Sequence, residues 1–351
     1  MIQTTLRVRY QEHSGKVSDK WSIYLDVYQH LFESFVDRPI SLLEIGVQNG
    51  GSLEIWTKHF PKAQHLVGCD IDPNCALLRY DDPRVSVIVG DANENEAERR
   101  IAEISPDYDI VIDDGSHVSG DIVRAFIRYF KRVKDGGFFL AEDLHCSYWK
   151  EFDGGLFDPR SSIAFFKRLV DVINHEHWGV PGARTAILRG FVEKYGDGID
   201  EELLASIHSV EFFNSICVVR KAPAQRNELG PRIFAGTSDV VSSQRLTMPA
   251  GKAPPPSQKD GRWSDIAELP EEREERLFRE LQEQTDLAHG LREELNAMRD
   301  AQFITVRVAE EARQAMLVQL DALQRQFDEV THTLSWRATA PLRAIRRWIE
   351  S

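Results

Sequence analysis

The chain has 351 residues, a length that fits one large domain or two small ones. Hydrophobic residues make up 42% of the chain and charged residues 28%, so a large core can form, yet no apolar run approaches the ~20 residues of a membrane-spanning helix. The net charge of −13 argues against a general nucleic-acid-binding protein, and the four cysteines lack the CxxC spacing of a zinc site.

Residues 1–221 are predicted to form an α/β domain. Short apolar runs alternate there with stretches of helical periodicity, which is typical of a parallel sheet covered by helices. The late segments around Ile187 and at Val210–Arg220 could form an antiparallel edge. We expect strands at Ser41–Ile45, His65–Asp70, Val85–Val89, Tyr108–Ile112, Gly137–Ala141 and Ser215–Arg220, and helices at Trp21–Phe35, Leu53–Lys58, Asn95–Ile104, Gly120–Val133 and Ser161–His175.

The first predicted strand leads into a glycine-rich segment, Leu42–Ser52, with the sequence LLEIGVQNGGS. Its glycines allow a ligand to approach the backbone, and the helix that follows offers free N–H groups. The ExGxxxGG spacing differs from the GxGxxG pattern of dinucleotide-binding proteins. We therefore assign cofactor contacts to this segment, namely Glu44, Gly46, Asn49, Gly50 and Ser52.

Aspartates follow the next two predicted strands. Asp70 ends the second strand, where a carboxylate can accept hydrogen bonds from both hydroxyls of a ribose. Asp72 precedes Pro73 and is expected to cap the following helix instead. Asp91 follows the third strand and could accept a hydrogen bond from an adenine amino group. Together with the glycine-rich segment, this order favours S-adenosylmethionine (SAM) over NAD.

Two clusters of acids and histidines follow the fourth and fifth predicted strands, DDGSH at 113–117 and EDLH at 142–145. Adjacent parallel strands end at the same edge of a sheet, so these clusters should lie side by side. Carboxylates crowded in this way repel one another unless a cation lies among them, and oxygen ligands favour Mg²⁺ or a similar divalent ion. We predict Asp114, Glu142 and Asp143 as metal ligands and assign Asp113 to the cofactor; in the alternative, Asp113 and Glu142 make structural hydrogen bonds.

His117 lies three residues beyond Asp114, near the predicted metal without having to bind it. A divalent ion lowers the pKa of a bound alcohol, and an imidazole can then accept the hydroxyl proton. We therefore predict His117 as the general base for attack of an alcohol on the sulfonium methyl group. His145 is the competing candidate, as a second base or an orienting group.

The stretch from Lys20 to Trp149 resembles the metal-dependent class I SAM methyltransferases that act on sugar hydroxyls of macrolide antibiotics, a group also described as cephalosporin-hydroxylase-like. The resemblance implies a Rossmann-like methyltransferase sheet with helices on both faces, SAM and a divalent cation as cofactors, and a sugar-containing acceptor. It also places Asp114, Glu142 and Asp143 at metal positions and His117 at a base position. The matching segments are KWS at 20–22 with Tyr24 and Tyr28, LEIG at 43–46, GGSL at 50–53 with Trp56, GCDID at 68–72, IDDGSH at 112–117, EDLH at 142–145 with SYW at 147–149, and SVEFFNS at 209–215 with Lys221.

Residues 222–270 contain seven prolines and many serines and glycines, which predicts an extended linker. In the alternative, Ile233, Phe234, Val240 and Val241 pack in a loop-rich subdomain. Residues 271–335 repeat apolar side chains every three and four positions from Leu277 to Met316, which is typical of a coiled coil. We expect this segment to join copies of the chain or a partner protein, with a single solvated helix as the alternative.

Residues 336–351 form a short basic tail with four arginines, one glutamate and two tryptophans. The segment SWRATAPLR at 335–343 resembles a motif that follows coiled coils in bacterial enzymes of surface polysaccharide synthesis. A basic helix with tryptophans could lie on an anionic inner leaflet, or it could bind a protein. With no apolar leader visible near the N-terminus, we expect a cytoplasmic protein, peripheral at the membrane at most.

The sequence therefore leads to one main hypothesis, a SAM- and metal-dependent O-methyltransferase of a sugar hydroxyl in bacterial surface polysaccharide biosynthesis. One alternative is an enzyme that methylates a natural-product sugar. Another is a scaffold or chain-length-control protein without catalysis. The intact acids and histidines at residues 113–117 and 142–145 argue against the scaffold.

Overall fold

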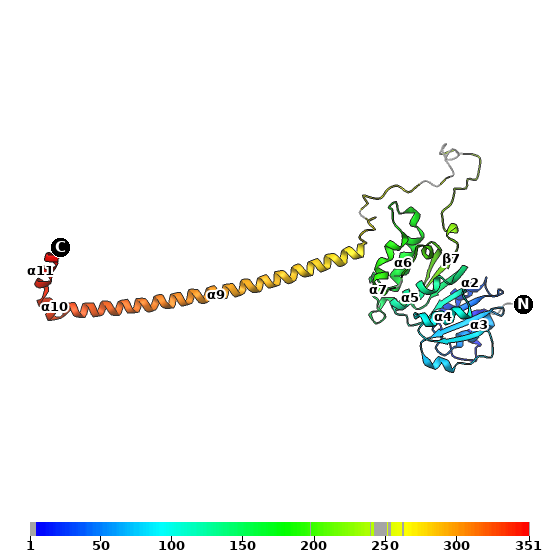
Figure 1. Cartoon of the computed structure of the whole chain (residues 1–351), viewed down its shortest axis with the longest axis horizontal. Helices are drawn as coiled ribbons and strands as arrows, with labels where there is room; N and C mark the ends of the chain where they lie inside the picture. Colours follow the sequence, from blue (N-terminus) through cyan, green and yellow to red (C-terminus); the bar gives the residue numbers. More distant parts are fainter. Residues whose placement is uncertain are drawn as a thin grey trace. The chain divides into compact units, whose positions relative to one another are not determined.

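The computed structural model describes residues 5–196, 198–238, 240–241, 251, 254–261 and 263–350 (Figure 1). The chain divides into two compact units, one ending at Arg273 and the other running from Glu274 to Ser351. Several residues of the predicted linker, 239, 242–250, 252–253 and 262, lie outside the described residues.

The first unit is built on a seven-stranded sheet with the strand order β3-β2-β1-β4-β5-β7-β6. Strands β1 to β5 run parallel, whereas β7 pairs antiparallel with β5 and β6 pairs antiparallel with β7. The predicted parallel sheet is therefore confirmed. An antiparallel edge forms within residues 207–221, but the segment around Ile187 is a 3₁₀ turn and not a strand of that edge. The strands are β1 Ser41–Ile45, β2 His65–Asp70, β3 Val85–Val89, β4 Tyr108–Asp113, β5 Val133–Ala141, β6 Ile207–Phe213 and β7 Ile216–Lys221.

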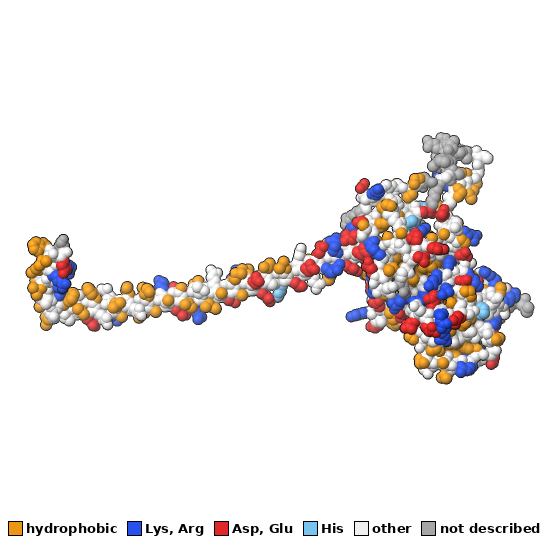
Figure 2. Space-filling model, in the orientation of Figure 1, with side chains coloured by type: hydrophobic (Ala, Val, Ile, Leu, Met, Phe, Trp, Pro, Cys, Tyr) orange, Lys and Arg blue, Asp and Glu red, His pale blue; other side chains and the backbone are white. Residues whose placement is uncertain are grey.

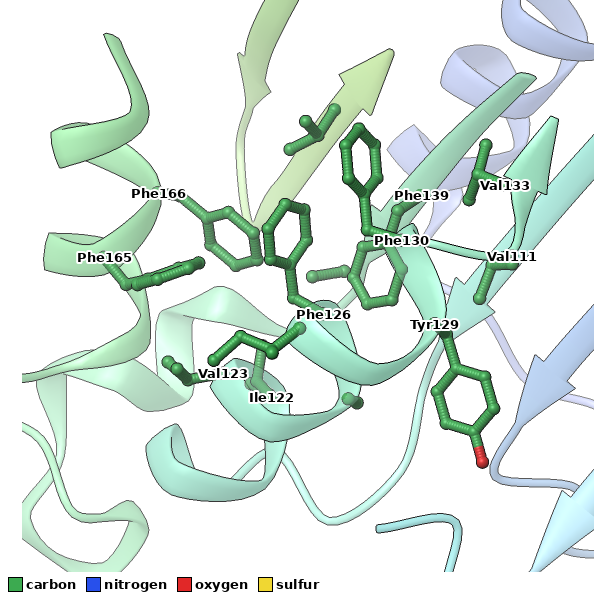
Figure 3. Close-up of a cluster of buried hydrophobic side chains, with 14 of the residues drawn as sticks. Val111, Ile122, Val123, Phe126, Tyr129, Phe130, Val133, Phe139, Phe165 and Phe166 are labelled. Carbon is green, nitrogen blue, oxygen red and sulfur yellow. The ribbon is translucent and has the colours of Figure 1, made fainter. Parts of the chain in front are cut away.

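Helices cover both faces of this sheet because neighbouring strand residues are apolar on both sides. Leu42 belongs to a core cluster with the first three helices, and Leu43 belongs to another with the fifth and sixth. Figure 3 shows the cluster that contains Leu43, where Phe126 of α5 packs against Phe130, one turn further along the helix, and against Phe139 of β5. The helices of this unit are α1 Leu6–Gln11, α2 Ser22–Phe32, α3 Gly51–His59, α4 Asn95–Ile104, α5 Ser119–Phe130, α6 Ser162–Ile173, α7 Arg189–Tyr195 and α8 Glu201–Ala205, with short 3₁₀ turns at η1 Pro73–Leu77, η2 Leu144–Tyr148, η3 Lys150–Phe152, η4 His175–His177, η5 Arg184–Leu188 and η6 Ala224–Arg226.

The residues of the predicted linker differ in their burial. Ile233, Val240 and Val241 are at least 90% exposed, so these three side chains form no packed subdomain. The last residues of the linker dock on the first unit, where Leu269 is buried in the core. There the carboxylate of Glu272 accepts hydrogen bonds from Arg189 of α7.

The second unit consists of a long helix, whose first residues up to Arg273 belong to the first unit, and two short helices. Helix α9 spans Pro270–His332 and is followed by α10 Leu334–Ala338 and α11 Ala340–Glu350. Residues 274–330 are all exposed in the single chain, and Figure 2 shows apolar side chains along this helix. None of the helices in the described part of the chain has an apolar stretch long enough to traverse a bilayer.

The side chain of His59 makes folding stability depend on pH. It is buried against Phe32 and Phe60, its Nε2 has no hydrogen-bond partner among the described residues, and burial lowers its pKa to about 4. At this side chain the unfolded state binds more protons than the folded state between about pH 4 and 6.5, so the contribution of His59 to stability falls as the pH falls through this window. We expect this contribution to fall by about 2.5 kcal/mol between pH 7.5 and 4.5. Buried carboxyl groups with a raised pKa, such as that of Glu44, act in the opposite direction, so the effect is measured as the difference between the parent chain and His59→Leu in urea denaturation at the two pH values. A difference that stays the same at both pH values contradicts this assignment.

Candidate active site

A cavity of about 730 Å³ opens at the carboxyl ends of the parallel strands. Ligands of open α/β sheets bind at this edge because the loops that leave the strands converge there. The loops after β1 to β5 all contribute to its lining, and so does the segment 17–24 near the N-terminus. The sequence predicts the contribution of the strand loops, whereas that of the N-terminal segment is new.

The loop after β1 approaches the loop after β4 so closely that only glycine fits between them. Gly46 has a φ of +88°, and a Cβ built on it would lie 2.0 Å from the carbonyl oxygen of Asp114. The amide of Asp114 in turn donates a hydrogen bond to the carbonyl of Ile45. Gly46 therefore sets the spacing between the cofactor side of the cavity and its acidic side.

We expect Gly46→Ala to abolish SAM binding and to destabilise the fold. The added methyl group meets backbone atoms that cannot move aside, and L-residues rarely adopt this φ. Gly136→Ala is the matched control, because Gly136 has a φ of +83° and a Cβ added there would meet nothing within 4 Å among the described residues. Calorimetric titration with SAM and thermal unfolding measure both effects. Equal behaviour of the two variants would show that backbone conformation alone, and not the close approach, matters.

Asp70 is held ionised at the end of β2. Burial acts to raise its pKa, but hydrogen bonds from the backbone amides of Asp72, Gln48 and Val47 outweigh burial and lower the pKa below its usual value. Asp70 lines the cavity, as does Asp91, whose carboxylate accepts a hydrogen bond from the amide of Asn93. Asp72 accepts a hydrogen bond from the amide of Asn74 and precedes η1, so the predicted cap is confirmed.

The residues predicted to contact the cofactor from the glycine-rich segment divide into two sets. Gly46 and Ser52 line the cavity, whereas Glu44, Asn49 and Gly50 are not among its lining residues. Glu44 is fully buried, accepts hydrogen bonds from the Ser52 hydroxyl and the Trp56 indole of α3, and has its pKa raised to about 7 by burial. The hydrogen bonds to its Oε2 hold α3 against β1, and Glu44 itself does not line the cavity.

Asp113 lines the cavity at the end of β4 and is 5% exposed. Burial raises its pKa to about 8, and its Oδ2 has no hydrogen-bond partner in the described part of the chain. A buried acceptor without a partner is costly unless a ligand supplies a donor. This orphaned oxygen therefore fits the assignment of Asp113 to a cofactor.

Asp114, His117 and Asp143 form a group suited to a cation. Their ligand atoms all lie within 4.8 Å of one another, and His117 Nε2 lies 3.5 Å from Asp143 Oδ2. His117 and Asp143 adopt φ values of +58° and +53°, conformations that cost energy and persist where surrounding structure enforces them. The two carboxylates, from adjacent strand ends, offer the oxygen ligands that a divalent ion prefers, and the imidazole lies beside them.

Glu142, the other predicted metal ligand, is already paired in this structure. Its two carboxylate oxygens accept hydrogen bonds from Lys20 Nζ at 2.8 and 2.9 Å, and Tyr28 donates a further hydrogen bond to Oε1. Lys20 also forms an ion pair with Asp114. Burial acts to lower the pKa of Lys20, but the charges of Glu142 and Asp114 together hold it well above its usual value. A cation from the protein itself therefore lies among the acids.

Sequence reasoning assigns no role to Lys20, although it notes the KWS segment. The signal that could have found it is charge balance, because buried acids need a positive partner and the segment before Trp21 supplies a lysine. Trp21 and Tyr24 are further contacts that sequence reasoning misses. The Trp21 indole and the Tyr24 hydroxyl both donate hydrogen bonds to Asp143 Oδ1, at 3.1 and 2.5 Å.

His145 lines the cavity but differs from His117 in its partners. Its Nδ1 lies 2.5 Å from the hydroxyl of Ser215, in the turn between β6 and β7, and 3.8 Å from Asp143 Oδ1. The two predicted base candidates thus lie on either side of Asp143. His117 lies in the group with Asp114, whereas His145 is turned toward the antiparallel edge.

Comparisons with known proteins relate this chain to methyltransferases. Residues 26–142 match the family described as FtsJ-like methyltransferase. The chain is 38% identical over 179 residues to 8-demethyl-8-alpha-L-rhamnosyl tetracenomycin-C 2'-O-methyltransferase of Streptomyces olivaceus, covering 48% of this chain and 46% of that protein. It is 36% identical over 160 residues to mycinamicin VI 2''-O-methyltransferase of Micromonospora griseorubida, covering 42% of this chain and 39% of that protein.

A solved structure gives the same answer for the fold. The MycE methyltransferase from the mycinamycin biosynthetic pathway, in complex with Mg, SAH and mycinamycin VI, has a TM-score of 0.51 and 26% identity, covering 64% of this chain and 55% of that chain. The chain spans about half the length of the curated relatives it matches. The chain therefore contains a Rossmann-like methyltransferase domain with an FtsJ-like region at residues 26–142, and its homologues include sugar O-methyltransferases.

Proposed function

We propose that this protein is a SAM- and divalent-metal-dependent O-methyltransferase that acts on a sugar hydroxyl. The observation that carries the proposal is the group of Asp114, His117 and Asp143 at the edge of a methyltransferase sheet. Relatives whose names specify O-methylation of rhamnosyl groups support the reaction, and the Mg and SAH in the MycE complex support both cofactors.

Nine residues of the cavity lining have a role in this proposal. Asp70, Asp91 and Asp113 bind the SAM molecule, with Gly46 and Ser52 beside it. Asp114 and Asp143 would hold the metal ion, and Glu142 stays the third proposed ligand. A bound divalent ion would lower the pKa of the acceptor hydroxyl. His117 takes the hydroxyl proton while the oxygen attacks the methyl carbon, the carbon–sulfur bond breaks, and S-adenosylhomocysteine leaves as a neutral thioether.

The acceptor is best supported as the sugar of a natural-product glycoside. The names of the relatives specify rhamnosyl tetracenomycin and mycinamicin compounds, which matches the natural-product alternative better than surface polysaccharide. The test uses the full chain, SAM and methyl α-L-rhamnopyranoside, with mass spectrometry of the product. Methylated sugar that appears with Mg²⁺ and disappears with a chelator supports the proposal. SAM binding without transfer to any sugar glycoside would favour the scaffold alternative.

We further propose that copies of the chain associate along α9 and that α11 lies on an anionic lipid surface. The apolar seam of α9 is exposed, and α11 carries Leu342, Ile345 and Trp348 together with three arginines. The support for association and for membrane contact comes from residues 271–351 alone. The same residues are the only support for a polysaccharide acceptor. Analytical ultracentrifugation should show an oligomer, and the double variant Leu291→Glu with Leu295→Glu should be a monomer. In a flotation experiment, the chain should rise with phosphatidylglycerol vesicles. A monomeric parent chain, or no flotation, contradicts the respective proposal.

A further inference from the structure

Two exposed tryptophans flank His145 beside the cavity. Trp21 is 61% exposed and Trp149 is 49% exposed. The ring of Trp21 lies 6.1 Å from that of His145, and the ring of Trp149 lies 5.1 Å from it, both in edge-on arrangements. Trp21 and His145 line the cavity. Trp149 does not line it but contacts His145. One exposed tryptophan therefore lines the cavity, and a second lies beside the lining residue His145.

Neighbouring groups contact both rings. The indole N–H of Trp21 donates a hydrogen bond to Asp143 Oδ1, so its polar atom is satisfied and its ring stays beside the proposed metal ligands. Trp149 lies between η2 and η3, where it also contacts the ring of Phe152 at 6.0 Å. An indole whose N–H is paired internally offers a flat apolar face to whatever enters the cavity.

This pair of rings lies away from the proposed adenosine end of the cavity. Asp70 and Asp91 belong to the ends of β2 and β3, whereas His145 follows β5 on the other side of β1 and β4. The rings are therefore not the wall for the adenine of SAM. They belong to the side where Asp114, His117 and Asp143 gather and where an acceptor has to present its hydroxyl.

We propose that Trp21 and Trp149 form the platform on which the pyranose ring of the acceptor stacks. This inference rests on the proposed function and adds its acceptor subsite. A pyranose has an apolar face of C–H groups and a rim of hydroxyls, so it matches an aromatic plane that borders acidic residues. Exposed aromatic patches at the mouth of a cavity mark ligand-binding surfaces. A pyranose stacked on Trp21 would lie beside Asp143, to which the same indole is hydrogen-bonded.

Saturation-transfer NMR with methyl α-L-rhamnopyranoside tests the platform without any turnover. In the full chain with S-adenosylhomocysteine and Mg²⁺, saturation should reach the C–H protons of one sugar face. Trp149→Ala and Trp21→Ala should each weaken sugar binding by about two- to tenfold. Trp21→Phe keeps an aromatic face and loses only the hydrogen bond to Asp143, so it should retain most of the sugar signal.

The matched control is Trp178→Ala. Trp178 also makes an edge-on contact with a histidine, His175 at 4.7 Å, but it is not among the residues that line the cavity. Its replacement should leave the sugar signal unchanged, and calorimetry should give parental SAM affinity for every variant. Parental sugar binding in both alanine variants, or no saturation transfer in the parent chain, overturns the platform. Failure of the proposed function is a separate result, because it would appear as absent methyl transfer while the sugar signal persists.

Discussion

Replacing His117 by alanine is expected to reduce methyl transfer to a sugar hydroxyl by about 10²–10⁴-fold, the usual contribution of a positioned general base. His117 lies in the group with Asp114 and Asp143, with its Nε2 3.5 Å from Asp143 Oδ2. An imidazole at this place accepts the hydroxyl proton as the methyl group transfers. Turnover of methyl α-L-rhamnopyranoside under saturating SAM and Mg²⁺ measures the effect.

SAM binding and a second histidine separate catalysis from structure. His117→Ala should keep parental SAM affinity in calorimetry, since Asp70 and Asp91 lie at the ends of other strands. His145→Ala is the control, because His145 Nδ1 faces Ser215 and should cost much less turnover. The opposite ranking of the two variants would assign the base to His145. Unchanged turnover in both would remove histidine from the proton transfer.

The strands were predictable where a short apolar run stands between polar turns. The bounds of β1, β2 and β3 agree with the prediction. Strand β5 begins at Val133, four residues before the predicted start, because the exposed Asp135 and Gly136 interrupt its apolar pattern. Val133 nevertheless pairs with Tyr108 across an irregular register. The first residue of a strand such as β5 depends on pairing with a neighbouring strand. The sequence of one segment does not reveal that pairing.

The acidic side of the cavity was predictable from strand order alone. Strands β4 and β5 pair with Asp113 opposite Ala141, so the residues that follow each strand meet. The partners of those residues were not predictable, because Lys20 precedes Asp114 by 94 positions and Glu142 by 122. Which lysine or arginine enters a cluster depends on how the N-terminal segment packs, and periodicity carries no information about that. The sequence pattern assigns Glu44 to the cofactor, and it does not reveal that Glu44 Oε2 accepts hydrogen bonds from Ser52 and Trp56 of α3.

Replacing Lys20 by methionine should make the stability of the first unit depend on Mg²⁺. The side chain of Lys20 is 3% exposed, that of Glu142 is 1% exposed, and the ammonium group pairs with both Glu142 and Asp114. Removing one partner of a buried ion pair costs about 3–5 kcal/mol, since the remaining charges are left without compensation. For a domain of this size we expect the melting temperature to fall by about 10 °C in the presence of a chelator.

Magnesium should return much of that loss in the variant, because an ion that binds only the folded state stabilises it according to its concentration and affinity. The parent chain should respond less, since Lys20 already neutralises part of the acidic cluster and competes with the ion. Lys16→Met is the matched control: Lys16 pairs with Glu54, but its side chain is 27% exposed, so its loss should cost less than about 1 kcal/mol and create no dependence on Mg²⁺. Equal responses to Mg²⁺ in the parent chain and in Lys20→Met would show that the lysine and the ion do not share the acids, because competition requires that removing the lysine strengthen the binding of the ion.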